Sequence, residues 1–88
     1  MLYAEQIRAA RGLLDWSQTE LAKRAGVSPV TVKRLETGTG LVRGNADTVF
    51  RIQNAVAQAG VIFIDASDGH GPGVRLAAVP RSRGRQTR

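Results

Sequence analysis

Residues 18–37 read QTELAKRAGVSPVTVKRLET and contain two helix signals separated by a glycine. Ser17 and Glu20 form a capping box at the start of the first signal: the serine oxygen can accept an amide of the first turn, and the glutamate can reach back to the cap. Gly26 follows at a place where a left-handed residue ends a helix without steric cost. The pattern predicts a short helix over 18–25 and a sharp turn.

The second helix signal begins at Ser28, a favourable N-cap. Pro29 suits the first helical position because its missing N–H would be unsatisfied there. A helix over 29–37 places Val32 and Leu35 on its inner side, since successive residues turn by about 100°. The opposite side carries one β-branched residue, two cations and a hydroxyl, and no acid: Val30, Lys33, Arg34 and Thr37.

The rest of the chain has further helical and strand patterns. The expected elements are a helix over 4–11 that ends at Gly12, a helix over 46–59 capped by Asn45, and strands over 61–65 and 74–77 that pair as a hairpin. From Pro80 onward the residues are arginine, serine, glycine, glutamine and threonine, which cannot bury enough apolar surface to become ordered. We therefore expect a disordered basic tail over 80–88.

The composition favours a large anionic partner. The 88 residues carry a formal charge of +6, and without the four arginines after Pro80 the charge is +2, from nine basic and seven acidic residues. There is no cysteine for disulfides, thiolate metal sites or thiol nucleophiles. The longest apolar run is far shorter than the roughly 20 residues of a membrane span. These features predict a small cationic domain inside the cell, with no membrane contact.

The stretch from Gln18 to Gly38 resembles the helix-turn-helix of the Cro/C1-type regulators, also called the XRE family, and the resemblance extends over residues 5–60. It implies an all-α, lambda-repressor-like fold of four helices over residues 1–60. A β appendage over 61–79 would follow. It also implies a non-enzymatic, sequence-specific DNA-binding regulator, most simply a repressor, in the bacterial cytoplasm and associated with the nucleoid.

The resemblance also implies roles for individual residues. Gln18 corresponds to a residue that contacts the DNA backbone, Arg34 to one that reads base edges, and Arg43 to a cation in the loop along the backbone. Arg11 and Glu36 correspond to a buried ion pair. Helix N-termini suit phosphate groups. The expected DNA-binding residues are Ser17, Gln18, Ser28, Pro29, Val30, Thr31, Lys33, Arg34 and Arg43.

The front of the second helix departs from relatives that carry glutamines there. Pro29 and Val30 cannot form bidentate bonds to adenine, and Val30 can make only an apolar contact, for example with a thymine methyl. Arg34 is therefore the main candidate for hydrogen-bonded readout, which would favour guanine. One such contact gives ~1–3 kcal/mol of discrimination. This modest gain predicts binding as a dimer to double-stranded DNA.

The expected dimer interface lies within residues 61–77, because an apolar strand edge is a liability unless a second copy covers it. A second hypothesis is an antitoxin-like module that binds a toxin and also regulates its own operon. An enzyme is a third reading, resting on Asp65, Asp68 and His70. These residues sit in a turn without a second histidine, so we expect no catalytic site, no metal and no cofactor.

Overall fold

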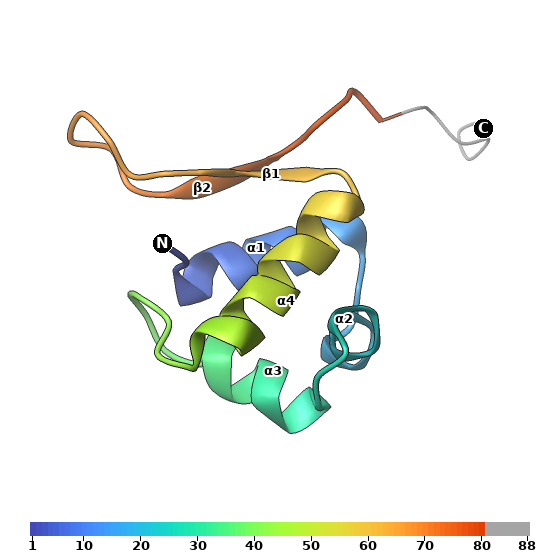
Figure 1. Cartoon of the computed structure of the whole chain (residues 1–88). Helices are drawn as coiled ribbons and strands as arrows, with labels where there is room; N and C mark the ends of the chain where they lie inside the picture. Colours follow the sequence, from blue (N-terminus) through green and yellow to red (C-terminus); the bar gives the residue numbers. More distant parts are fainter. Residues whose placement is uncertain (81–88) are drawn as a thin grey trace.

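Four helices and one β-hairpin make up residues 1–80, the part of the chain that the computed structural model describes (Figure 1). The helices are α1 (Ala4–Leu14), α2 (Gln18–Ala25), α3 (Pro29–Glu36) and α4 (Ala46–Gln58), and the strands are β1 (Val61–Ile64) and β2 (Gly73–Leu76). The predicted four-helix fold with a helix-turn-helix and a short hairpin is confirmed. The disordered tail expected over 80–88 falls, from residue 81 onward, outside the described residues.

The end of α1 differs from the sequence prediction. We expected Gly12 to end this helix, but the helix continues through Gly12 to Leu14. Asp15 ends it instead, with a left-handed φ of 57° that aspartate tolerates better than most residues. A glycine inside a helix costs only about 1 kcal/mol. The packing of Leu14 against the core provides a physical reason for the extra turn.

The core lies where the four helices meet. Its innermost side chains come one from each helix and are fully buried: Ile7, Leu21, Val32 and Ile52. Ala22 and Ala25 are also buried, and their small side chains let α2 approach its neighbours closely. Each fully buried aliphatic side chain contributes ~1.5–3 kcal/mol, so this cluster fixes how α3 sits on the other helices.

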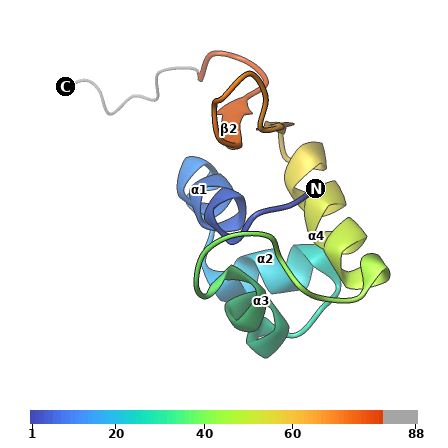
Figure 2. The ribbon, with the colours of Figure 1, turned by 90° about the vertical axis from the view of Figure 1, so that its left-hand side faces the viewer.

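The hairpin covers one end of the helical domain. Its strands pair in antiparallel register, with Val61 opposite Leu76 and Ile64 opposite Gly73. The inner face packs on the core through Val61, Phe63, Val74 and Leu76, and the outer face exposes Ile62, Ile64 and Arg75. Figures 1 and 2 show the hairpin above α1 and α4, with α3 at the opposite end of the domain.

Gln6 joins the hairpin to α1. Its side chain is buried, and its amide nitrogen donates hydrogen bonds to the carbonyl oxygens of Ile64 (3.2 Å) and Gly73 (3.0 Å). Its amide oxygen accepts from the Tyr3 N–H at 2.9 Å. Because a buried amide without partners is costly, the two bonds to the strands hold the loop end of the hairpin in a defined position on α1.

Candidate nucleic-acid interface

The caps and the turn between α2 and α3 follow the sequence prediction, except that the Glu20 side chain bonds Arg24 and does not complete the capping box. Ser17 Oγ accepts a hydrogen bond from the Glu20 amide at 2.9 Å, and Ser28 Oγ accepts one from the Thr31 amide at 3.1 Å. Gly26 has a left-handed φ of 73° and ends α2. These two serine caps and the Gly26 turn fix where α3 starts, independently of the core.

The outer face of α3 presents side chains to solvent over its whole length. Val30 is 71% exposed, and Lys33 and Arg34 are exposed beside it. Neither cation takes part in the ion pairs found within residues 1–80. The single acid of α3, Glu36, is buried on the inner side. The exposed face of α3 therefore carries positive charge without a compensating acid.

Arg34 and Arg43 lie at the same hollow. The loop after α3 folds back along its end, and the two arginines line a depression of about 320 Å³ together with Thr37, Thr39 and Gly40. The structure thus brings together two of the expected DNA-binding cations from separate elements. Ser17, Ser28 and Pro29 are exposed at the helix starts, and Thr31 is half-buried.

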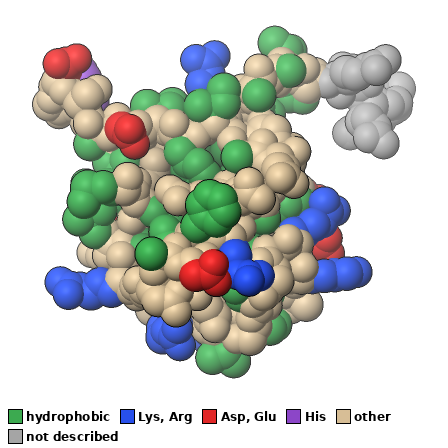
Figure 3. Space-filling view, in the orientation of Figure 1, with side chains coloured by type: hydrophobic (Ala, Val, Ile, Leu, Met, Phe, Trp, Pro, Cys, Tyr) green, Lys and Arg blue, Asp and Glu red, His purple; other side chains and the backbone are tan. Residues whose placement is uncertain are grey.

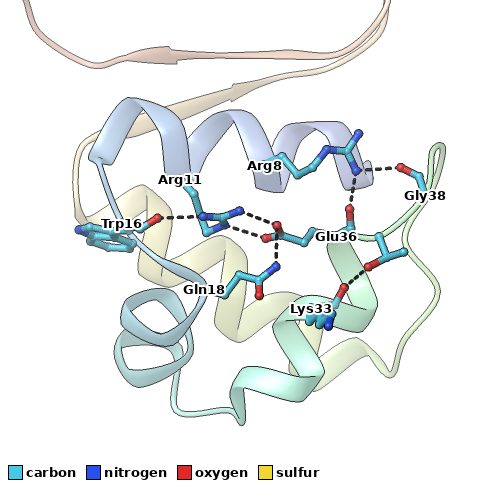
Figure 4. A network of polar contacts seen from close by, with 8 residues as sticks. Arg8, Arg11, Trp16, Gln18, Lys33, Glu36 and Gly38 are labelled. Atoms are coloured by element: carbon cyan, nitrogen blue, oxygen red, sulfur yellow. Dashed lines mark hydrogen bonds and ion pairs between the residues drawn. The ribbon is translucent and has the colours of Figure 1, made fainter.

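Arg11 and Glu36 form a bidentate ion pair between α1 and α3 (Figure 4). Arg11 Nε donates to Glu36 Oε2 at 2.8 Å and Nη2 donates to Oε1 at 2.6 Å, while Nη1 donates to the Trp16 carbonyl at 3.0 Å. Burial by itself raises the pKa of Glu36, which is 3% exposed, but the hydrogen bonds from Arg11 and Gln18 outweigh it and hold that pKa below its ordinary value. The hydrogen bond to Glu36 raises the pKa of Arg11. Both groups are therefore charged at neutral pH.

Gln18 is turned toward this ion pair. Its amide nitrogen donates to Glu36 Oε1 at 3.0 Å, so one of its donors is already engaged inside the protein (Figure 4). The resemblance led us to expect a contact with the DNA backbone. In this position the residue also locks the first turn of α2 against the last turn of α3.

Arg8 is a structural residue that the sequence reasoning missed. Its Nη1 donates to the Glu36 carbonyl and, at 2.8 Å, to the Gly38 carbonyl, so it caps the C-terminus of α3 and holds the following loop (Figure 4). The spacing of arginines in α1 could have indicated this role. Arg8 precedes Arg11 by three residues and so lies on the same side of α1. An arginine there can reach the end of the helix that Arg11 contacts.

Other kinds of site are not indicated within the described residues. Residues 1–80 contain no group of three or more histidine, cysteine, aspartate or glutamate side chains placed to hold a metal ion. In the same range, no helix has the length and apolar character needed to cross a bilayer.

The comparisons with known proteins identify the family. The helix-turn-helix family model HTH_3 matches residues 7–55, which span most of α1, all of α2 and α3, and most of α4. A search of curated proteins found no match. Because the family model covers more than half of the chain and its match centres on the capped α2–turn–α3 unit described above, this chain belongs to the Cro/C1-type (XRE) helix-turn-helix family of DNA-binding regulators.

Proposed function

We propose that the chain is a sequence-specific transcriptional regulator that inserts α3 into the major groove. One observation carries the proposal: the outward face of α3 exposes Val30, Lys33 and Arg34, while its only acid is buried against Arg11. An acid-free helix face of this kind is the electrostatic footprint of a nucleic-acid-binding element. Repression is the simplest output, because occupying a promoter blocks transcription without a further contact to the polymerase.

The proposed DNA contacts are of two kinds: some recognise bases, and the others bind phosphates and position the protein on the duplex. Arg34 reads guanine through a bidentate pair worth ~1–3 kcal/mol, and Val30 contacts a thymine methyl. Lys33 and Arg43 bind phosphates. The remaining positioning contacts come from the starts of α2 and α3, where amides and hydroxyls suit phosphate oxygens: Ser17, Gln18, Ser28 and Thr31. Pro29, which has no N–H, contacts DNA only through its apolar ring at the front of α3.

We further propose that the protein binds as a homodimer and is not an enzyme. A single α3 reads only a few base pairs, so useful specificity needs two half-sites about one helical turn, ~34 Å, apart. Its place of action is the bacterial nucleoid, where double-stranded DNA is the partner.

Two copies could contact each other through residues 61–77 in two arrangements, and only one of them lets both copies bind the same side of DNA. The hairpin lies at the end of the domain opposite α3 (Figures 1 and 2). Stacking two outer faces would point the two α3 helices away from each other. Edge-to-edge strand pairing would keep them on one side of the dimer.

The experiment that tests the proposal is selection from a pool of randomised duplexes with the full chain. We expect a two-fold symmetric site. Arg34→Ala should weaken binding to it about 5- to 150-fold per half-site and relax one base position. Arg75→Ala, which removes an exposed cation from the hairpin, is the matched control and should leave affinity nearly unchanged. A pool that yields no preferred sequence contradicts sequence-specific binding.

A second candidate function is that of an antitoxin-like module that also regulates its operon. It is favoured by the hairpin, whose outer face exposes Ile62 and Ile64 at the end of the domain away from α3. A toxin held there would leave α3 free for DNA. Copurification with the product of the neighbouring gene, lost on Ile62→Ser and Ile64→Ser substitution, tests this alternative.

A further inference from the structure

Binding two half-sites on one side of DNA restricts where two copies can touch. The two-fold axis of such a dimer passes through the DNA, so both α3 helices must lie on the same side of the dimer. Apart from edge-to-edge pairing of the hairpin, a contact on a flank of the domain, beside α3, meets this requirement. Figure 2 shows α4 on such a flank, with no other element of the described chain beyond it.

The outward side of α4 carries an unusual residue for a solvent-exposed helix face. Phe50 is 63% exposed although it sits in the middle of the helix. Ala46 and Ala57 are exposed one turn before and two turns after it, on the same stripe of the helix. Their side chains are small, and the residue between Phe50 and Ala57 on this stripe, Asn54, is exposed and polar. Figure 3 shows separate hydrophobic patches on this face of the molecule, with an acidic and a basic side chain next to each other near its centre.

The apolar surface continues from α4 to the N-terminal segment. A depression of about 370 Å³ lies beside Phe50 and is lined mainly by apolar side chains, among them Met1, Leu41, Val42 and Val49. Met1 and Leu41 are themselves exposed. This surface is therefore broader than one side chain and lies between the hairpin and α3.

The charged residues on this surface can pair with the same residues of a second copy. Asp47 and Arg51 lie together on one side of Phe50, with Arg51 Nε 2.8 Å from Asp47 Oδ2, and their side chains are 71% and 50% exposed. A two-fold axis close to Phe50 brings Asp47 of one copy to Arg51 of the other, and the same contact occurs twice. We propose that a second copy of this chain docks on this surface, with Phe50 at its centre. This inference rests on the proposed function, because the two-fold operator supplies the geometric requirement.

The first test compares self-association of full-length variants by sedimentation equilibrium, without DNA and with the duplex that the wild-type protein selects. We expect Phe50→Ala to weaken dimerisation about 30-fold, as expected for truncation of a central interface anchor. Leu13→Ala, which removes an exposed apolar side chain from α1 and lies outside the proposed DNA contacts, should leave dimerisation unchanged. Ile62→Ser tests the outer face of the hairpin as a rival interface and should also have no effect.

The second test uses the charges and separates contacts between copies from those within one helix. Asp47→Lys alone and Arg51→Glu alone each place like charges across the axis, so each variant should dimerise roughly tenfold more weakly. Mixing the two variants should restore association as a heterodimer, because opposite charges then face each other at both contacts. Circular dichroism checks that each variant is folded.

These outcomes separate the inference from the proposed function. Loss of dimerisation in Phe50→Ala, with rescue in the mixed charge variants, supports the inference whether or not a duplex is selected. Unchanged association of Phe50→Ala, or no rescue on mixing, overturns it while leaving DNA binding standing. Loss of dimerisation in Ile62→Ser alone assigns the interface to the hairpin and also overturns it. A wild-type protein that binds its selected duplex as a monomer overturns it as well.

Discussion

Replacing Arg11 by methionine should remove a large share of the stability of this domain. The change deletes both hydrogen bonds to Glu36 and the bond to the Trp16 carbonyl, and it leaves the buried carboxylate with the Gln18 amide as its remaining side-chain partner. Breaking a buried pair in this way costs ~3–5 kcal/mol. Because the Arg11 side chain is 22% exposed and water can approach, we expect the lower end, about 3 kcal/mol. This loss corresponds to a fall in Tm of roughly 12–24 °C.

Urea denaturation followed by circular dichroism measures the effect. The control is Arg24→Met, which breaks the exposed pair with Glu20 and the contact of Arg24 with the Trp16 ring and should cost much less, because solvent screens the exposed pair. A loss below about 1 kcal/mol for Arg11→Met, equal to the control, would refute the reasoning that burial makes this pair important.

The contribution of Glu36 to folding stability should change with pH in opposite directions in the wild type and in Arg11→Met. In the wild type the pKa of Glu36 is lowered on folding, so its contribution is complete above the unfolded pKa of about 4.3 and is lost as pH falls through the folded value. In Arg11→Met the uncompensated burial raises that pKa. The variant should therefore regain stability relative to wild type as pH falls from 7 toward 4. A penalty that stays constant over this range would contradict the assignment.

Four further changes have defined outcomes. Gln6→Ala should cost about 2–3 kcal/mol and speed amide exchange in both strands, and protection that stays at the wild-type level would contradict its anchoring role. Arg8→Ala should cost about 1–2 kcal/mol and speed exchange in the loop after α3, without changing exchange in the hairpin. Gly26→Ala should cost about 1–2 kcal/mol by urea denaturation, because the residue has a left-handed φ of 73°. Deleting residues 81–88 should flatten the salt dependence of DNA binding by up to ~0.9 in log–log slope per arginine that contacts phosphate, and an unchanged slope would exclude such contacts.

The sequence predicted the elements whose signals are local. Ser17, Gly26, Ser28 and Asn45 act on residues three or four positions away, and each ends or begins its helix where expected. The hairpin was also predictable, since its strands are β-branched and separated by a turn-rich segment. Gly12 misled the prediction because the packing of one leucine outweighed a small helix penalty.

The contacts that orient α3 were less predictable because they join residues distant in sequence. Gln18 reads as a polar first-turn residue, and its inward bond depends on how α2 packs against α3. The hydrogen bonds of Gln6 to the hairpin span 58 and 67 residues, and no sequence period reports them.

Three side chains of α1 give that helix a mechanical role. In its 11 residues, Gln6 holds the hairpin, Arg8 holds the end of α3, and Arg11 holds Glu36. The helix thus connects the hairpin at one end of the domain to α3 at the other. A force on the hairpin would therefore reach α3 through Gln6, Arg8 and Arg11 of this one helix.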